Sequence, residues 1–190
     1  MKNLTEIFNK CGSDKGTHAI WGWENKHLNY TEVYENYFNK WRLNNINFLE
    51  IGIHDPRFPG ASISAWTEYF PNANFYGYDI VDCIKFEKPR VKTFKGDQNS
   101  KDDLNRFIKE AACEFDIVVD DGSHILEHVL TTFTYIFPKL KNGGYYFIED
   151  LMVMNLRVLL SFLDDNKEKM GIKNYTLFNN NWLILIEKHE

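Results

Sequence analysis

The chain has 190 residues, a formal net charge of -5 and 44% hydrophobic residues. This length suits one domain with a single core, and the apolar content is too high for an intrinsically disordered chain. A net negative charge creates no global positive field, which argues against nucleic acid and anionic lipid as partners. A compact polar substrate is therefore the better expectation.

The cysteines favour a reduced compartment, and the apolar runs argue against a secretory signal and a membrane span. Cys11, Cys83 and Cys113 are odd in number and widely spaced, without the CxxC pairs typical of thiolate metal sites or redox centres. Residues 1–10 space their apolar side chains as a helix does and lack the continuous apolar core of a secretory signal. No later apolar run is long enough to span a bilayer. We therefore expect a cytoplasmic protein with no membrane span.

Short apolar runs alternate with helical patterns from Asn47 onward. The expected strands cover residues 48–53, 75–79, 91–95, 115–119 and 145–148. Helical patterns begin at Ala61, recur from Leu104 to Ala112, and run from Ile125 to Phe137. Pro138 and the run 142–144, Asn-Gly-Gly, are expected to end the last of these helices. Strands that alternate with helices predict parallel strands joined by right-handed crossovers.

The tail of the chain has a different pattern. After a helix expected from about Asn155 to Leu163, two strand-like runs at 175–178 and 182–186 flank three asparagines. This spacing predicts an antiparallel hairpin. We expect one α/β domain over residues 1–190, with 1–45 as a helical and aromatic cap segment and 46–190 as the core. Its sheet is expected to be mostly parallel and seven-stranded, with the hairpin at its C-terminal end.

Polar residues recur where the predicted parallel strands end. In chain order they are Glu50, Asp79, Asp97-Gln98, Asp120-Asp121 with Ser123-His124, and Glu149-Asp150. One such acid is most simply a turn former or a helix cap, but a series at the same sheet edge is harder to explain in that way. Ligands bind beyond the carboxyl ends of parallel strands, so this edge is the expected site.

The loop after the first strand argues against NAD as the ligand. Gly52 lets the backbone approach a ligand, and Asp79 is placed to accept hydrogen bonds from ribose hydroxyls. The residues after Gly52 lack the GxGxxG pattern that holds a pyrophosphate, which favours a nucleoside without phosphates. Ser62, near the start of the next helix, is either an N-terminal cap or part of a pocket for an amino-acid carboxylate.

Several of these segments resemble a known enzyme family. The matching segments are residues 12–17, 48–53, 66–73, 77–80, 96–98, 115–124 and 144–150, and the most specific are Asp-Asp-Gly-Ser-His at 120–124 and Ile-Glu-Asp at 148–150. They resemble class I S-adenosylmethionine-dependent methyltransferases, which have a Rossmann-like fold. The similarity is greatest to the sugar O-methyltransferases of macrolide biosynthesis, of the demethylmacrocin O-methyltransferase type, and to enzymes that modify bacterial polysaccharide sugars.

The resemblance implies a methyl transfer to a hydroxyl of a sugar or a saccharide-linked small molecule, with S-adenosylmethionine and Mg2+ as cofactors. The expected partner is a small-molecule or saccharide acceptor, without nucleic acid, and homo-oligomerisation is left open. The expected cofactor-binding residues are Glu50, Gly52, Ser62, Asp79, Asp97, Gln98 and Asp121. The resemblance also implies that Asp121, Glu149 and Asp150 bind Mg2+, with His124 as general base.

These roles are chemically consistent with one another. Carboxylate oxygens are hard ligands suited to Mg2+, and a hydroxyl on the metal loses its proton more easily to a neutral imidazole. Three carboxylates that converge without a cation repel one another, so the metal-free site is expected to be strained. Asp14 and Lys15 are expected near the site by resemblance, although a lone basic loop residue is usually solvated.

Two other functions stay open. The segment from His124 to His128 matches the HxxEH pattern of inverted zinc peptidases, in which two histidines four residues apart on a helix bind zinc. The second alternative is a non-catalytic relative that binds a nucleoside or a partner chain. The chain has almost nothing between Asp150 and the helix near Asn155, where larger relatives carry an insertion that helps to enclose the acceptor. The acceptor is therefore the least specified part of the prediction.

Aromatic residues are concentrated in the N-terminal segment. They are Trp21, Trp23, Tyr30, Tyr34 and Tyr37. The three tyrosines have helical spacing, which predicts that they pack against the core, and some of the five are candidates for covering a sugar.

Overall fold

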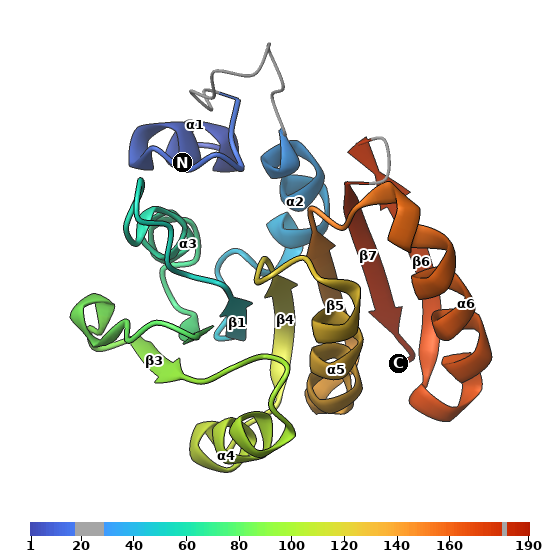
Figure 1. Cartoon of the computed structure of the whole chain (residues 1–190). Helices are drawn as coiled ribbons and strands as arrows, with labels where there is room; N and C mark the ends of the chain where they lie inside the picture. The colour runs from blue at the N-terminus through green and yellow to red at the C-terminus, as the bar shows by residue number, and fades with distance from the viewer. Residues whose placement is uncertain (18–28, 180–181) are drawn as a thin grey trace.

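The computed structural model describes residues 1–17, 29–179 and 182–190 (Figure 1). Trp21 and Trp23 lie outside the described residues, as do two of the three asparagines of the expected hairpin turn. The helices are α1 (Leu4–Cys11), α2 (Tyr30–Phe38), α3 (Ala61–Tyr69), α4 (Lys101–Ala111), α5 (Leu126–Ile136) and α6 (Val153–Met170), with short 3-10 helices η1 (Asn39–Trp41), η2 (Ile84–Phe86) and η3 (Phe137–Lys139). The strands are β1 (Asn47–Ile51), β2 (Asn74–Asp79), β3 (Val91–Lys95), β4 (Phe115–Asp120), β5 (Leu140–Glu149), β6 (Ile172–Phe178) and β7 (Leu183–Lys188).

The strands form one seven-stranded sheet in the order β3-β2-β1-β4-β5-β7-β6. Strands β1 to β5 pair in parallel, whereas β7 runs antiparallel to both β5 and β6. The predicted fold class is therefore confirmed, including the C-terminal antiparallel pair. The strand order reverses between β1 and β4, and the crevice beyond the carboxyl ends at such a reversal is where open parallel sheets bind ligands.

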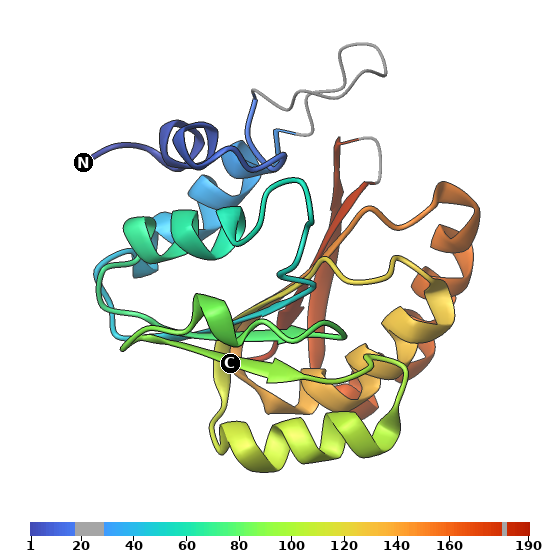
Figure 2. The ribbon, with the colours of Figure 1, turned by 60° about the vertical axis from the view of Figure 1, so that its left-hand side comes forward.

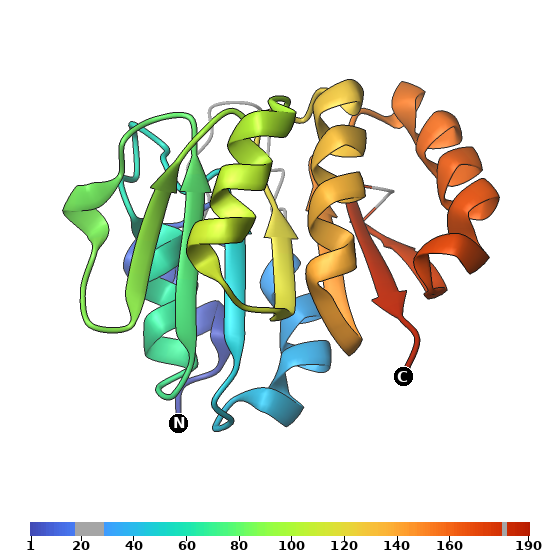
Figure 3. The same ribbon diagram turned by 90° about the horizontal axis from the view of Figure 1, so that it is seen from below.

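Helices cover both faces of the sheet (Figures 2 and 3). Helices α1, α2 and α3 bury their apolar side chains on one face, and α4, α5 and α6 do so on the other. Strand β4 shows why the central strands read as continuous apolar runs: Ile117 and Val119 enter the first cluster and Val118 enters the second, and all three are 0% exposed. A strand covered on both faces needs apolar side chains at every position.

Strand β5 and helix α6 differ most from the expected bounds. Strand β5 begins at Leu140, so Gly143 and Gly144 lie inside the strand, where Gly143 has a positive φ of 73° and the pairing with β4 shifts register. The glycines therefore mark a bulge, and η3 ends the helix before them. Helix α6 continues to Met170, beyond the end expected near Leu163. Its last turns are polar and lie beyond the buried Leu159 and Leu163, so the apolar pattern ends before the helix does.

The N-terminal cap segment packs directly on the sheet. Phe38 of α2 is fully buried and its ring contacts Phe48 of β1, Trp66 of α3 and Phe147 of β5. Helix α1 in turn packs against α3. No helix in the described part of the chain is long and apolar enough to cross a membrane.

These contacts predict that the cap segment and the sheet unfold together as one domain. Phe38→Ala should lower the free energy of unfolding by about 3–5 kcal/mol, the usual cost of removing a buried phenylalanine ring. Urea unfolding followed by both tryptophan fluorescence and circular dichroism would measure it, with Ile84→Ala, an exposed position, as the control. Two separate transitions, or a loss as small as that of the control, would contradict a single domain.

Candidate active site

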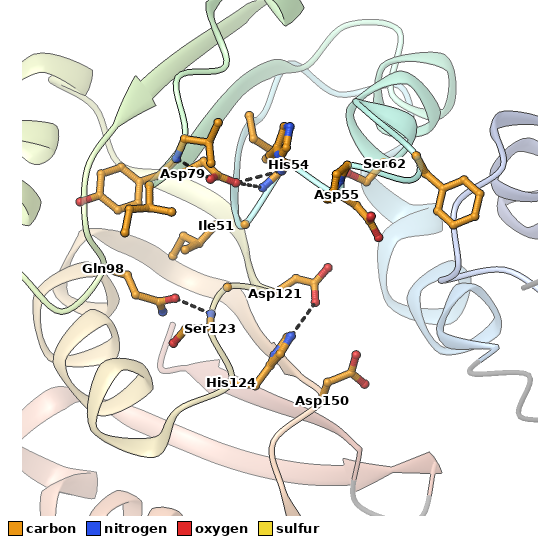
Figure 4. A pocket seen from close by; sticks show the side chains of 18 of the residues that line it. Ile51, His54, Asp55, Ser62, Asp79, Gln98, Asp121, Ser123, His124 and Asp150 are labelled. Atoms are coloured by element: carbon orange, nitrogen blue, oxygen red, sulfur yellow. Dashed lines mark hydrogen bonds and ion pairs between the residues drawn. The ribbon is translucent and has the colours of Figure 1, made fainter. Parts of the chain in front are cut away.

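A cavity of about 610 Å³ opens at the carboxyl edge of the parallel strands (Figure 4). Its walls come from the loops after β1, β2, β3, β4 and β5 and from the short segment of residues 13–15 after α1. Figure 4 shows Asp79 and Gln98 on one side of this space and Asp121, His124 and Asp150 on another. The sheet edge that collects the predicted polar residues is therefore the edge that carries the cavity.

The turn after β1 requires a glycine. Gly52 has a φ of 81°, and a Cβ atom at this position would lie 2.0 Å from the carbonyl oxygen of Asp121. The Gly52 N–H donates to the Tyr78 carbonyl at 2.8 Å, so the turn is held against β2 while the loop after β4 passes close beside it. Gly52 therefore lets the backbone come close to another loop that lines the cavity, whereas the close approach to a ligand that the sequence suggests stays a prediction.

Asp79, at the end of β2, holds the loop after β1. Its Oδ2 accepts hydrogen bonds from the backbone N–H groups of Ile53 at 2.8 Å and His54 at 2.9 Å, and its Oδ1 accepts from Val81 at 2.8 Å. A carboxylate offers about four acceptor positions, so one remains for a hydroxyl in the cavity. Asp79 both shapes the cavity wall and keeps the capacity to bind a ligand.

Gln98 is fixed as part of the wall beyond β3. Its amide oxygen accepts from the N–H of Ser123 at 2.6 Å, and its amide nitrogen donates to Thr132 at 3.1 Å. Asp97 is fixed as well, because its carboxylate accepts from the N–H of Asn99 at 2.8 Å and its carbonyl accepts from the Tyr78 hydroxyl at 3.1 Å. Both residues line the cavity, as expected of cofactor-binding residues.

Glu50 lies behind the cavity wall, contrary to the prediction that it contacts the ligand. It is 0% exposed, and its carboxylate accepts from the Ser62 hydroxyl at 2.8 Å and from the Trp66 indole at 3.2 Å. Its side chain points from β1 toward α3, so it positions Ser62, which does line the cavity. Burial raises the pKa of Glu50 to about 7.

An acidic centre formed by Asp121, Glu149 and Asp150 lies beside the cavity, and its charges are compensated from the N-terminal segment. The Lys15 ammonium bonds to Asp121 and lies 2.8 Å from Glu149. The Tyr34 hydroxyl donates to the other Glu149 oxygen at 2.5 Å, and the Tyr30 hydroxyl donates to Asp150.

Lys15 lies at the site, as the resemblance implies, but it is buried, with 3% of its side chain exposed, and is not a solvated loop residue. The expectation of repulsion among the three carboxylates left out this cation and the two hydroxyl donors beside them. The Gly12–Thr17 segment was part of the family resemblance, but its own sequence gives no sign of burial. The helical spacing of Tyr30 and Tyr34 predicts that they pack against the core. The same spacing also places both hydroxyls on one side of α2, where they donate to the acidic centre.

The electrostatics of the centre follow from burial and crowding. Burial lowers the pKa of Lys15, but attraction by Asp121, Glu149 and Glu50 outweighs it and holds the pKa of the ammonium well above its ordinary value. Burial, together with repulsion between neighbouring acids, raises the pKa of Asp121 and of Glu149. More carboxylates than cations therefore share this small volume, which favours binding of a further cation.

The described residues contain one group able to hold a metal ion: Asp121, His124 and Asp150 each offer a donor atom, and these atoms lie within 4.8 Å of one another. His124 and Asp150 both have positive φ, 57° and 54°, a strained backbone conformation that is enriched at functional sites. Carboxylate oxygens at this spacing fit a hard divalent cation. Glu149, whose oxygens are held by Lys15 and Tyr34, stands just outside this group, so its role as a ligand stays a prediction.

The zinc-peptidase pattern is not assembled. His124 lies before α5, which begins at Leu126, so the two histidines do not share a helical face. The Nδ1 atom of His128 bonds to the Ser123 hydroxyl at 2.9 Å, and His128 is outside the metal-capable group of the described residues. His124 has a positive φ, and its ring nitrogen Nδ1 lies 3.3 Å from the Glu149 carbonyl at the end of β5.

The strand order and the position of the cavity are those of a class I methyltransferase fold. The whole chain aligns with the structure of the MycE methyltransferase of mycinamycin biosynthesis in complex with Mg, SAH and mycinamycin VI, with a TM-score of 0.83, 28% sequence identity and coverage of 54% of that chain. No protein-family model matches the sequence.

Sugar O-methyltransferases are similar to this chain in sequence. It is 39% identical to the mycinamicin VI 2''-O-methyltransferase of Micromonospora griseorubida over 125 residues. The aligned segment covers 64% of this chain and 31% of the relative. It is 38% identical to the 8-demethyl-8-alpha-L-rhamnosyl tetracenomycin-C 2'-O-methyltransferase of Streptomyces olivaceus over 158 residues. This second alignment covers 82% of this chain and 39% of the relative. The resemblance noted in the sequence is thus confirmed, and the chain spans less than two fifths of the length of these relatives.

The buried Glu50 predicts a pH-dependent contribution to stability. Its pKa of about 7 exceeds that of an unfolded glutamate, so between about pH 4.5 and 7 the folded state keeps a proton that the unfolded state loses, and stability falls as pH rises. The loss across this window is on the order of 3 kcal/mol, since each pKa unit corresponds to about 1.4 kcal/mol. Glu50→Gln should remove this part of the slope in urea unfolding measured from pH 4.5 to 8.

The comparison needs an exposed glutamate as its control. Glu110→Gln on α4 should keep the slope of the unmodified protein. A Glu50→Gln profile parallel to that of the unmodified protein would mean that Glu50 is ionised in the folded state throughout.

Proposed function

We propose that the chain binds S-adenosylmethionine in the cavity and transfers its methyl group, with a divalent cation, to a hydroxyl of a sugar. The observation that carries this proposal is the position of the acidic centre: Asp121 lines the same cavity whose opposite wall is formed by Asp79 and Gln98. A nucleoside held at one end would point its reactive group toward a metal-capable group at the other. The sugar O-methyltransferase names of the relatives support the same reaction.

The cavity walls suit a nucleoside that carries an amino-acid tail. The free acceptor position of Asp79 can bind a ribose hydroxyl, and the walls around Asp97 and Gln98 can enclose a base. Ser62 donates its hydroxyl proton to Glu50, which leaves lone pairs that accept a hydrogen bond. This suits an ammonium group of the ligand better than the carboxylate that the sequence suggested.

The acidic centre suits the activation of a hydroxyl. A divalent cation bound there would lower the pKa of a sugar hydroxyl. Asp121 and Asp150 would hold such a cation, with Glu149 as the further ligand that the resemblance implies. His124 lies at the cavity surface, with 35% of its side chain exposed, where its imidazole can accept the hydroxyl proton as the oxygen attacks the methyl carbon.

We also propose that the acceptor is a neutral saccharide and that the protein works in the cytoplasm. A chain with a net charge of -5 and an acidic reaction centre suits a neutral saccharide better than nucleic acid. Cys11, Cys83 and Cys113 are all free, which suits a reducing, cytoplasmic environment.

Cofactor binding tests the first half of the proposal. Isothermal titration calorimetry should detect S-adenosylmethionine and SAH but not NAD. Asp79→Ala should weaken binding by about 1–3 kcal/mol, because the ribose loses an acceptor and the loop after β1 loses its anchor. Asp82→Ala, which removes an exposed acid from the loop after β2, is the control and should bind normally. Binding of NAD in place of S-adenosylmethionine would refute the assignment, and an unchanged Asp79→Ala variant would place the adenosine elsewhere.

Metal dependence and base catalysis test the second half. A chelator should abolish methyl transfer to glycosides, measured as SAH formation, while most of the SAH affinity remains. His124→Ala should slow turnover by about 100- to 10,000-fold, the range typical of losing a general base, with Mg2+ affinity near that of the unmodified protein. A large loss of Mg2+ affinity would make His124 a ligand instead. Cofactor binding without turnover on any glycoside would favour the non-catalytic alternative.

A further inference from the structure

Lys15 is the buried cation of the acidic centre, and its burial needs an explanation beyond folding. Its side chain is 3% exposed, and the ammonium contacts one oxygen of Asp121 and one oxygen of Glu149. A buried lysine is costly to keep unless its partners compensate for the lost hydration. Asp121 and Glu149 are also two of the three carboxylates that the family resemblance assigns to Mg2+.

The backbone around Lys15 is held firmly. The carbonyl of Lys15 accepts from the Thr31 N–H at 3.2 Å, and the carbonyl of Gly16 accepts from the Asn29 N–H at 3.3 Å. A Cβ atom on Gly16 would lie 2.3 Å from the side-chain oxygen of Asn9, so this loop is tightly packed against α1. Any movement of the ammonium must therefore come from rotation of the side chain. Lys15 lines the cavity, which provides the space for that rotation.

The ammonium and a metal ion compete for the same carboxylates. Lys15 bonds to Asp121, which belongs to the metal-capable group, and to Glu149, the further ligand that the resemblance implies. Two positive charges that share the carboxylates of Asp121 and Glu149 would repel each other strongly, because the Lys15 and Glu149 side chains are buried. While Lys15 stays in place, the donors that remain are those of Asp121, His124 and Asp150. With the ammonium withdrawn, Glu149 can complete a set of three carboxylates, and the His124 imidazole is then free to accept a proton.

We propose that Lys15 is an internal counter-cation that neutralises Asp121 and Glu149 in the metal-free protein and withdraws from them when a divalent cation binds, so that it sets the metal affinity of the centre. This inference rests on the proposed function, because it takes the acidic centre to be the metal site. Lys15 is then a positioning residue that determines which side chains hold the cation.

Removing the ammonium should strengthen metal binding and weaken the metal-free fold. Titration calorimetry with Mg2+, and separately with Mn2+, should give Lys15→Met a dissociation constant at least about 10-fold lower than that of the unmodified protein, within the usual range of coupling between two binding events. In excess chelator the thermal midpoint of Lys15→Met should fall, and Mg2+ should restore it. Lys141→Met, which breaks the more exposed pair with Asp116, is the control and should alter neither the metal affinity nor the response of the midpoint to Mg2+.

A second measurement uses the unmodified protein, so it does not depend on the folding of a variant. Acetylation of Lys15 by acetic anhydride, followed by peptide mass spectrometry, should be slow in chelator and several-fold faster in saturating Mg2+, while Lys141 reacts at the same rate in both. Lys15→Gln, which is neutral but keeps a hydrogen-bond donor, replaces Lys15→Met if the latter does not fold.

The outcomes separate this inference from the proposed function. If the unmodified protein binds Mg2+, but Lys15→Met binds it equally or more weakly and the Lys15 acetylation rate ignores Mg2+, the counter-cation role is wrong and the metal site stands. If neither protein binds Mg2+ or Mn2+, the metal part of the proposed function fails together with this inference. S-adenosylmethionine binding in the same samples then reports whether the cofactor part survives.

Discussion

Burying several carboxylates at one sheet edge requires cations or hydrogen-bond donors beside them, because an unpaired buried charge destabilises the folded state severely. In this protein the donors come from the N-terminal segment. Lys15 contacts Asp121 and Glu149, while Tyr30 and Tyr34 of α2 donate to Asp150 and Glu149. The acidic centre beyond β4 and β5 is therefore completed by residues more than one hundred positions earlier in the chain.

The same N-terminal segment is part of the hydrophobic core. The ring of Tyr34 packs against Phe38, Trp66 and Phe147, while its hydroxyl reaches Glu149. One side chain thus joins the apolar cluster on the face of the sheet to the polar centre at its edge. Tyr30 and Tyr34 both pack in the apolar cluster and donate to the acidic centre, so these donors of the site are anchored in the core.

The cofactor side of the cavity is built from loops that hold one another. The carboxylate of Asp79 fixes the loop after β1, Gly52 of that loop lies against the carbonyl of Asp121, and Gln98 holds the N–H of Ser123. These contacts connect the ends of β1, β2, β3 and β4 to one another. Loops that are already ordered need to give up little conformational entropy when a ligand binds, which favours affinity.

The sequence by itself determined the α/β class, the parallel direction of the central strands, the C-terminal hairpin and the sheet edge that holds the site, because hydrophobic periodicity and strand-end residues are local signals. It also identified Asp79, Gln98 and Asp121 as lining residues. Only the tertiary structure decided that Glu50 turns away from the cavity to hold Ser62, that the His124 ring lies against the Glu149 carbonyl, and that Lys15 is buried. These depend on which face of a strand meets which helix and on contacts between distant segments, for which no pattern of neighbouring residues provides a signal.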